Sequence, residues 1–216
     1  MGVFGGLSPS MLQVDNVSCV RGERRLITAL SFTVQEGRLL AVTGANGSGK
    51  TSLLRMLCGL LPAEQGRILW RGKEIHTCKE RYLASLIYIG HLNGLKEDLT
   101  SVENVTISAR LVGEEISEAK ACEALEGVGL GRPIQRLPTR VLSQGQKRRV
   151  TLARLQLSQR SLWILDEPFA ALDASAVDLL MQQLRSHLSN GGIVVAATHQ
   201  EIDVGEGRLE QLRLAG

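Results

Sequence analysis

The sequence lacks any apolar run of the length that a membrane-spanning helix requires. No stretch approaches the roughly 18 consecutive apolar residues that are needed to cross a bilayer. If this protein works at a membrane, it therefore does so by docking to something that spans it. Residues 1–10 also lack the basic segment that begins a secretory signal peptide, and we expect this Gly- and Ser-rich stretch to be a flexible lead-in.

Cysteine is also scarce, with four residues in a chain of 216, and none of them forms a C-x-x-C pair or has a His partner at metal-binding spacing. This pattern predicts reduced thiols in a cytosolic protein and excludes a disulfide framework or a zinc site. The net charge of +3 is compatible with an anionic ligand, nucleic acid or a membrane surface, and it demands none of them. There is no internal repeat, low-complexity tract or heptad run, so the composition indicates one ordinary globular domain.

Three short apolar runs predict buried strands, at residues 39–42, 162–165 and 193–197. Each run is rich in Leu, Ile and Val and does not alternate with polar residues, which is typical of strands that are buried on both faces. Helical patterns separate the strands, and this arrangement predicts a parallel sheet in an α/β fold. One helix places five apolar residues on a single stripe: Val177, Leu180, Met181, Leu184 and Leu188.

The remaining segments predict two further parts of the fold. Residues 31–34 alternate, and residues 68–75 read as strand, turn and strand, so we expect a small antiparallel sheet beside the parallel one. Residues 92–155 are mostly helical, most clearly over 114–126 and 144–157. We therefore divide a single domain, residues 11–216, into a core with the antiparallel β subdomain (11–91 and 156–216) and a helical subdomain (about 92–155).

A phosphate-binding motif follows the first apolar strand. Its pattern, G-x-x-x-x-G-K-[ST], is the Walker A or P-loop sequence. Glycines let the backbone wrap closely, so that its N–H groups and the start of the next helix converge on phosphate oxygens. Lys50 supplies a charge to the β and γ phosphates, and Thr51 offers its hydroxyl to Mg²⁺. The predicted ATP-binding residues here are Gly44, Ala45, Asn46, Gly47, Ser48, Gly49, Lys50, Thr51 and Ser52.

Two adjacent acids end the second apolar strand, at the edge where open α/β sheets bind ligands. We expect Asp166 to hold Mg²⁺ together with Thr51. We expect Glu167 to be the catalytic general base for the attacking water, or at least to position it. A kinase or a GTPase would also explain the first acid, but neither requires a second acid directly after it.

Residues 142–146 read Leu-Ser-Gln-Gly-Gln shortly before this strand. Ser143 can cap the following helix, and Gly145 lets the backbone approach a ligand closely. In this order with the other two motifs, the segment resembles the signature sequence of the ABC ATPase superfamily. The resemblance covers the chain from about Leu12, and it implies a P-loop NTPase with a RecA-like parallel core sheet.

The resemblance also implies the assembly and further site residues. In this superfamily two subunits form a head-to-tail homodimer, and the signature of one subunit closes over the ATP held by the other. Ser143, Gly145 and Gln146 would then contact the partner's nucleotide. Residues 171–173 resemble the D-loop, and His199 resembles the switch histidine that contacts the γ-phosphate. The nearby basic residues Lys147, Arg148, Arg149 and Arg154 are interpreted as mostly a solvated helix face and not as a nucleic-acid patch.

Two positions depart from the superfamily pattern. The aromatic residue that usually stacks on adenine is replaced near Arg21, whose guanidinium plane can stack on the base or lie in solvent as a turn residue. The Gln that usually follows the strand at residues 86–89 is replaced near His91, which can substitute for it beside Mg²⁺ and water. Haem ligation by His91 is a second possibility, but the residue would face nucleotide.

These departures, with Gly-x-Lys-x-x-Leu-Thr after His91 and Trp-Ile-Leu-Asp-Glu-Pro-Phe from Trp163, resemble the ATP-binding subunits of bacterial haem exporters in cytochrome c biogenesis. That family implies a peripheral ATPase on the cytoplasmic face of the inner membrane, bound to integral membrane subunits. Its hydrolysis of ATP drives haem export or haem-chaperone release, and the complex, not this chain, handles the haem.

Two alternatives remain open at the level of sequence. The chain can be the ATPase of another importer or exporter, which the segment at residues 92–104 would discriminate because it would contact the membrane partner. It can also be a soluble ABC protein that acts on nucleic acid or ribosomes. Such proteins usually carry two cassettes or a long insertion between the Walker motifs, and this chain has neither.

Overall fold

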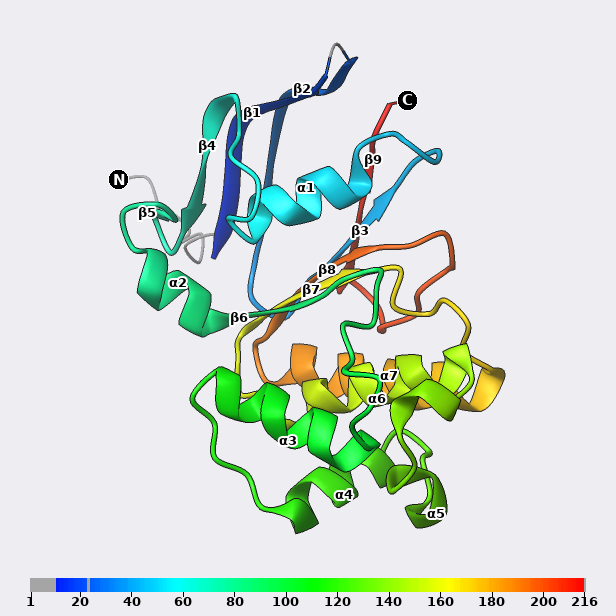
Figure 1. Ribbon diagram of the computed structural model, residues 1–216. Helices are drawn as coiled ribbons and strands as arrows, with labels where there is room; N and C mark the ends of the chain where they lie inside the picture. Colours follow the sequence, from blue (N-terminus) through cyan, green and yellow to red (C-terminus); the bar gives the residue numbers. More distant parts are fainter. Residues whose placement is uncertain (1–10, 23, 216) are drawn as a thin grey trace, which may run out of the picture.

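The strands form two sheets, a four-stranded antiparallel sheet of order β2-β1-β4-β5 and a five-stranded parallel sheet of order β6-β7-β8-β3-β9 (Figure 1). The computed structural model describes residues 11–22 and 24–215, so the predicted flexible segment 1–10 lies outside the described part. The predicted α/β class, with a parallel and an antiparallel sheet, is confirmed. The strands are β1 (Leu12–Arg21), β2 (Arg24–Val34), β3 (Leu39–Thr43), β4 (Gln65–Trp70), β5 (Lys73–Glu74), β6 (Leu86–Ile89), β7 (Leu162–Asp166), β8 (Ile193–Ala197) and β9 (Leu209–Arg213).

The three non-alternating apolar runs are β3, β7 and β8, and they lie side by side in the parallel sheet. Every residue of β7 and β8 is buried, as expected for strands that are covered on both faces. In the register of the sheet, Ala197 pairs with Val42 on one side and with Asp166 on the other. The carboxyl ends of these three strands therefore meet at one edge, and each is followed by a segment that the sequence marks as functional.

The helices cover both faces of the parallel sheet (Figure 1). Leu53 and Leu54 of α1 belong to the apolar cluster that this sheet shares with the antiparallel sheet. Leu152 of α6 and Leu184 of α7 belong to a second cluster on the opposite face. No helix in the described residues is both long and apolar enough to cross a membrane. The helices are α1 (Lys50–Leu57), α2 (Lys79–Ser85), α3 (Ser101–Leu111), α4 (Glu118–Glu126), α5 (Arg132–Gln135), the 3₁₀ turn η1 (Thr139–Val141), α6 (Gln144–Leu157) and α7 (Ala174–Ser189).

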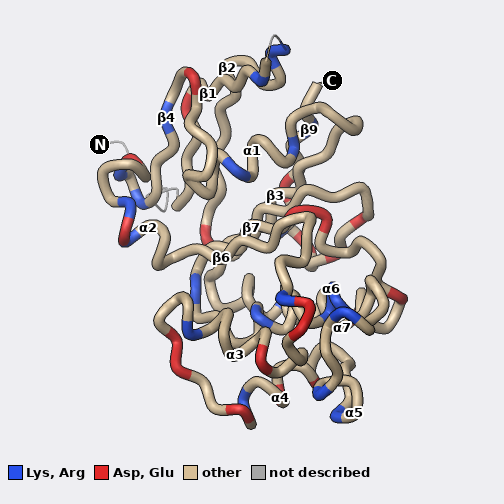
Figure 2. The backbone as a smooth tube through the Cα atoms, viewed as in Figure 1, with Lys and Arg blue, Asp and Glu red and all other residues tan. Residues whose placement is uncertain are grey.

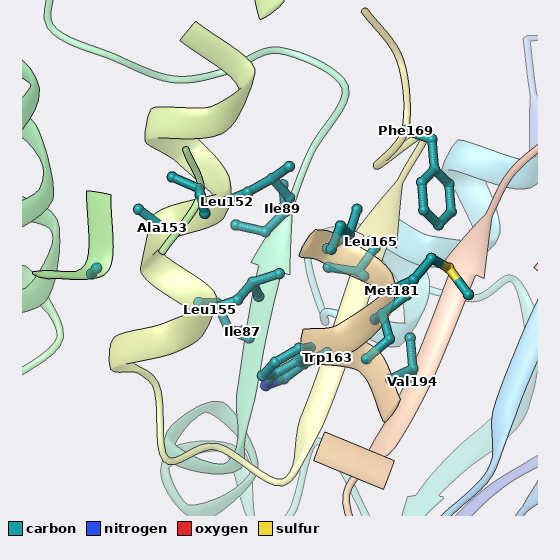
Figure 3. Packing of buried hydrophobic residues seen from close by; sticks show 14 of the residues in the cluster. Ile87, Ile89, Leu152, Ala153, Leu155, Trp163, Leu165, Phe169, Met181 and Val194 are labelled. Carbon is teal, nitrogen blue, oxygen red and sulfur yellow. The ribbon is translucent and has the colours of Figure 1, made fainter. Parts of the chain in front are cut away.

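Helix α6 is fixed to the parallel sheet by apolar packing. Figure 3 shows Leu152 and Leu155 of α6 beside Ile87 and Ile89 of β6, with Trp163 of β7 close by. Leu155 and Ile89 are each 1% exposed. Truncation of such a buried side chain to Ala typically costs about 2–5 kcal/mol, so α6 and the strand ends behave as one packed unit.

Helix boundaries follow the capping residues. The predicted helix at 114–126 begins instead at Glu118, because the Ser117 hydroxyl accepts a hydrogen bond from the Lys120 N–H at 3.2 Å. The predicted helix at 144–157 is confirmed at both ends. Its first turn is closed by a capping box, in which Ser143 and Gln146 exchange side-chain-to-backbone hydrogen bonds of 3.2 and 2.9 Å.

Candidate active site

The P-loop connects β3 to α1 in a tightly wound turn. Gly44 has a φ of 148°, and a Cβ atom there would lie 2.6 Å from the Ser48 hydroxyl and 2.9 Å from the Leu214 carbonyl. Only glycine fits such a position. The Lys50 ammonium folds back over the loop and donates to the carbonyls of Gly44 and Ala45, at 2.8 and 3.2 Å. The loop is thus a compact cradle with one positive charge held above it.

The amino terminus of α1 opens directly onto this cradle. The helix begins at Lys50, its cap is Gly49 without a side-chain hydrogen bond, and its first turn contains no acidic residue. The first N–H groups of a helix have no partner within the helix, and the helix dipole makes this end positive. The arrangement is therefore suited to an anion such as a phosphate group.

Two carboxylates lie at the end of β7 beside the P-loop. Asp166 is 2% exposed, and its Oδ2 atom accepts a hydrogen bond of 2.9 Å from the Thr51 hydroxyl. Glu167 follows with a φ of 49°, a left-handed conformation that is strained for a residue with a side chain. Its N–H donates to the Ala197 carbonyl at 2.9 Å. The chain therefore turns sharply after Asp166 and presents the second carboxylate next to the end of β8.

His199 lies just past β8 and approaches this second carboxylate. Its Nε2 atom is 3.4 Å from Oε1 of Glu167, and the two side chains are 52% and 25% exposed. The structure thus brings together the two residues that were predicted to be catalytic. Both are accessible to a bound substrate and to water, while Asp166 beside them is buried.

A cavity of about 620 Å³ joins the P-loop to the carboxylates. Four cationic side chains and two carboxylates line it. Figure 2 shows basic residues at the tip of the β1–β2 hairpin. This excess of positive charge suits a polyphosphate. Ten predicted site residues line the cavity: Arg21, Asn46, Gly47, Gly49, Lys50, Thr51, Ser52, His91, Asp166 and Glu167.

Three further lining residues were missed by sequence reasoning: Arg24, Leu26 and Arg55. Arg24 and Leu26 belong to β2, which crosses above the P-loop, and Arg55 lies one turn after Thr51 on α1. The spacing of Arg55 on the helix was the available signal, because residues four apart share a helix face. Nothing in the alternation of β2 distinguishes the residues that reach the cavity.

The two departures from the superfamily pattern, Arg21 and His91, both line the same cavity. Arg21 ends β1, and His91 follows the strand β6 by two residues. Their predicted roles stay predictions.

The signature residues do not line this cavity. Ser143, Gly145 and Gln146 lie at the start of α6, which packs on the opposite face of the parallel sheet from α1 (Figure 1). A Cβ atom at Gly145 would lie 2.6 Å from the carbonyl of Ala171, so glycine is also required by the approach of the chain's own D-loop segment. Within one chain, the signature and the phosphate cradle are separate.

The interpretation of the basic stretch as a solvated helix face is wrong. Arg148 is only 3% exposed, and the side chains of Lys147 and Arg149 are 15% and 14% exposed. Arg149 pairs with Asp173, and Arg154 is half-buried. The physical reason is that α6 is enclosed by the sheet, by α3 and α4 and by the loops after β6 and β7, so its cations reach carbonyls and carboxylates in place of water.

The four cysteines carry free thiols. Burial, with a contribution from the nearby Asp166, raises the pKa of Cys58 to about 12, so this thiol remains neutral. A neutral buried thiol is neither a metal ligand nor a nucleophile. Among the described residues, no cysteine lines the cavity at the P-loop.

Comparison with known proteins fixes the family. The profile of the ABC transporter family matches residues 27–170, which spans the P-loop, the signature and the paired acids. This chain belongs to the ABC transporter family. It is an ATP-binding and ATP-hydrolysing subunit of that family.

Relatives among ABC proteins cover nearly the whole chain. The cytochrome c biogenesis ATP-binding export protein CcmA of Dechloromonas aromatica is 54% identical over 94% of this chain and 100% of its own length. CcmA of Escherichia coli strain K12 is 42% identical over 94% of this chain and 96% of its own. The chain therefore belongs to the CcmA group of ABC proteins, which confirms the predicted resemblance.

A solved structure has the same fold. The ATP-binding cassette MJ0796, a dimer in a post-hydrolysis state bound to ADP and Pi, superposes with a TM-score of 0.80. It is 22% identical and covers 94% of this chain and 96% of its own. The predicted P-loop ABC ATPase fold is confirmed by this match.

Proposed function

We propose that this ABC ATPase drives haem export or haem-chaperone release in cytochrome c biogenesis. The observation that carries the proposal is the full-length identity of 54% to a protein named for cytochrome c biogenesis and export. The residues Arg21 and His91 are consistent with this proposal, because these two departures from the general superfamily pattern are among the features that resemble haem exporter subunits. Haem itself is handled by the complex and is not bound by this chain.

The P-loop amides and Lys50 hold the triphosphate in this proposal. Thr51 and Asp166 would hold Mg²⁺, since hydroxyl and carboxylate oxygens are the ligands that it prefers. The fit is supported by Asp166, which is 2% exposed and hydrogen-bonded to a neutral hydroxyl, so a cation there would compensate a buried negative charge. When bound, Mg²⁺ neutralises charge on the phosphate oxygens.

Glu167 acts as the general base. It accepts a proton from the water whose oxygen bonds to the γ-phosphorus, while the bond from that phosphorus to the bridging oxygen breaks and ADP leaves. His199 lies 3.4 Å from the Glu167 carboxylate and is half-exposed, which supports its role as a donor to the γ-phosphate. The cavity that Glu167 lines admits the water.

A complete site needs a second copy of the chain. Ser143, Gly145 and Gln146 do not line the cavity at the P-loop, and α6 packs on the opposite face of the parallel sheet from α1, so in this proposal they contact the nucleotide of a partner subunit. Two subunits then close head to tail over two ATP molecules. ATP contacts both the P-loop and the partner's signature only in the closed dimer. ATP therefore favours dimer formation, and hydrolysis lets the dimer reopen.

The partner that spans the membrane docks beside the nucleotide site. A groove of about 830 Å³ adjoins the cavity, shares Thr51, Arg55 and His91 with it, and carries apolar residues that are unusually exposed. Leu92 is 84% and Leu60 is 65% exposed. Exposed apolar residues of this kind suit a cytoplasmic segment of an integral membrane subunit. The ATPase is then peripheral, on the cytoplasmic face of the bacterial inner membrane.

A strain that lacks the chain, complemented with tagged protein, tests the proposal. We expect detergent-solubilised membranes to yield the tagged chain with integral membrane subunits and complementation to restore covalent haem in c-type cytochromes. The variant Glu167→Gln is the matched control, because it should capture the same subunits without restoring the cytochromes. Normal c-type cytochromes in the uncomplemented strain would refute the haem assignment and favour another importer or exporter, and co-purification with ribosomes or nucleic acid in place of membrane subunits would favour a soluble ABC protein.

A further inference from the structure

Arg148 is a buried cation that reaches the edge of the sheet where hydrolysis takes place. It lies in the second turn of α6 and is 3% exposed. Its Nη1 atom donates to the Gly90 carbonyl at 2.8 Å, and its Nη2 atom donates to the carbonyls of Asp166 and Glu167, both at 2.8 Å. Its Nε atom donates to the Pro168 carbonyl at 3.4 Å. One planar group therefore binds the ends of both β6 and β7.

A hydrogen bond from Arg148 fixes the carbonyl of Glu167, the residue with the strained φ. The Glu167 carbonyl is bonded to Arg148, and the Glu167 N–H is bonded to the Ala197 carbonyl at 2.9 Å. A φ of 49° persists only where surrounding contacts determine it. Both backbone groups of this residue are fixed, so the direction in which its side chain leaves the backbone is fixed as well.

The electrostatic setting of Arg148 also differs from that of a surface cation. Burial lowers the pKa of its guanidinium, while Asp166 and Glu167 nearby raise it. A buried cation is costly unless it is fully hydrogen-bonded, and here the acceptors are backbone carbonyls of the strand ends. A shorter or non-planar cation cannot reproduce a fork that spans these carbonyls.

We infer that Arg148 is a positioning residue that fixes the backbone of Glu167, and so aims its carboxylate at the attacking water. Arg148 touches no substrate and acts through Glu167. The inference rests on the proposed role of Glu167 as the base. Because Arg148 and the signature residue Ser143 share α6, the same helix carries a contact for the partner's nucleotide and the support for the base of its own chain.

Arg160 provides a matched control. Its guanidinium also donates to backbone carbonyls, those of Leu83 and Leu86 at 2.7 and 2.8 Å, but these lie at the opposite end of β6 from the site. Its side chain is 15% exposed. Loss of Arg160 removes a similar set of hydrogen bonds without touching the ends of β6 and β7 that carry the chemistry.

The first experiment compares Arg148→Gln, Arg148→Lys and Arg160→Gln for ATP affinity, kcat and thermal unfolding. We expect Arg148→Gln to lower kcat by about 10- to 100-fold, because a small misplacement of a catalytic group costs about that much. ATP affinity should change less than about twofold, because the P-loop is untouched. Arg148→Lys should retain an intermediate kcat and serves as the readout if Arg148→Gln does not fold. Arg160→Gln should lower the unfolding temperature and keep kcat per folded molecule.

The second experiment separates positioning from a general structural role by single-turnover hydrolysis in a double-mutant cycle. Once Glu167→Gln has removed the base, adding Arg148→Gln should slow the residual reaction less than about twofold, because Arg148 acts through that base. Additive losses, unchanged kcat in folded Arg148→Gln, or an equal kcat loss in Arg160→Gln would each overturn the inference. Near-normal hydrolysis by Glu167→Gln alone would instead refute the assignment of the base, and is distinguishable from all three.

Discussion

The side chains of Thr51 and Asp166 come from positions 115 residues apart, yet the Thr51 hydroxyl donates a hydrogen bond of 2.9 Å to the Asp166 carboxylate. This contact joins the start of α1 to the end of β7, so the phosphate cradle and the paired acids form one site. It also places two oxygen groups together of the kind that Mg²⁺ binds.

Removal of either oxygen group should weaken the response to Mg²⁺. Thr51→Val and Asp166→Asn should each raise the Mg²⁺ concentration for half-maximal ATPase activity, by about 10-fold or more, because loss of ligand charge and number lowers affinity for this cation. Thr51→Ser keeps the hydroxyl and is the control. The measurement is hydrolysis across a Mg²⁺ titration, and an unchanged midpoint in Asp166→Asn would contradict the assignment.

Glu167→Gln should retain ATP binding and largely abolish turnover. Loss of a positioned general base typically lowers the rate by about 100- to 10,000-fold, while the amide keeps the shape of the side chain. Binding is measured with a fluorescent ATP analogue and turnover by phosphate release. Glu206→Gln, at an exposed turn, is the control. Hydrolysis at a near-normal rate in Glu167→Gln would show that another group is the base.

Ser143→Arg should block ATP-driven dimerisation without stopping ATP binding. The arginine side chain is larger than serine and would occupy the space of the phosphates that the partner holds. The Ser143 hydroxyl also caps α6, so a separate loss of about 1 kcal/mol in stability is expected, and the assay must run well below the unfolding temperature. Size-exclusion chromatography with ATP, in a Glu167→Gln background, measures the dimer. Gln182→Arg on α7 is the charge control. Full-rate ATP hydrolysis by monomeric Ser143→Arg protein with Glu167 intact would refute the composite site.

Arg21→Ala should weaken ATP binding about three- to fivefold if the guanidinium stacks on the base, as expected for an exposed cation–π contact. Tripolyphosphate has no base, so its affinity should fall less. Arg21→Tyr should restore ATP affinity, and Arg24→Ala should weaken both ligands alike, because Arg24 would act by charge alone. Equal losses for ATP and tripolyphosphate in Arg21→Ala would show that Arg21 contributes only charge.

His187 should make the protein sensitive to mild acid. Its ring stacks on Trp163 with centroids 3.9 Å apart, and burial lowers its pKa from 6.5. The unfolded state therefore takes up a proton at a higher pH than the folded state. The contribution of neutral His187 to the free energy of unfolding is present above about pH 6.5 and is lost as the pH falls towards the folded pKa. His187→Phe keeps the stack and should show a smaller drop in unfolding midpoint between pH 7.5 and 5.5. An equal drop in both proteins would exclude His187.

The sequence predicts most of this fold because its signals are local. The strand at 193–197 and the helix at 144–157 have the predicted bounds, since an apolar run marks the strand and a capping serine, Ser143, marks the start of the helix. The start of α4 was placed four residues too early, because Glu114 favours helix but Ser117 caps it. Strand β9 was missed, because it is a short strand at the edge of the sheet with partly exposed residues.

The candidate site was predictable where residue spacing encodes it, and less so where the tertiary fold decides. Lys50, Thr51 and Asp166 meet because a P-loop and a strand end are recognisable motifs. Arg148 was read as a surface cation, because arginine is rarely buried and the loops that enclose it are distant in sequence. Its partners Gly90 and Glu167 contribute backbone carbonyl groups, which every residue has, so the contact cannot be predicted from the residue types.

The left-handed backbone at Glu167 lowers the stability of the fold in exchange for a catalytic carboxylate at this position. Glycine adopts such a backbone without steric strain. Glu167→Gly should therefore fold more stably, by up to about 1 kcal/mol after the larger entropy of its unfolded chain is subtracted, while it removes the carboxylate. A selection for heat resistance alone would therefore favour inactive chains at this position. The strained φ at Glu167 would be retained only while its carboxylate is needed for hydrolysis. A glycine at this position in a related chain would therefore indicate that this site no longer hydrolyses ATP.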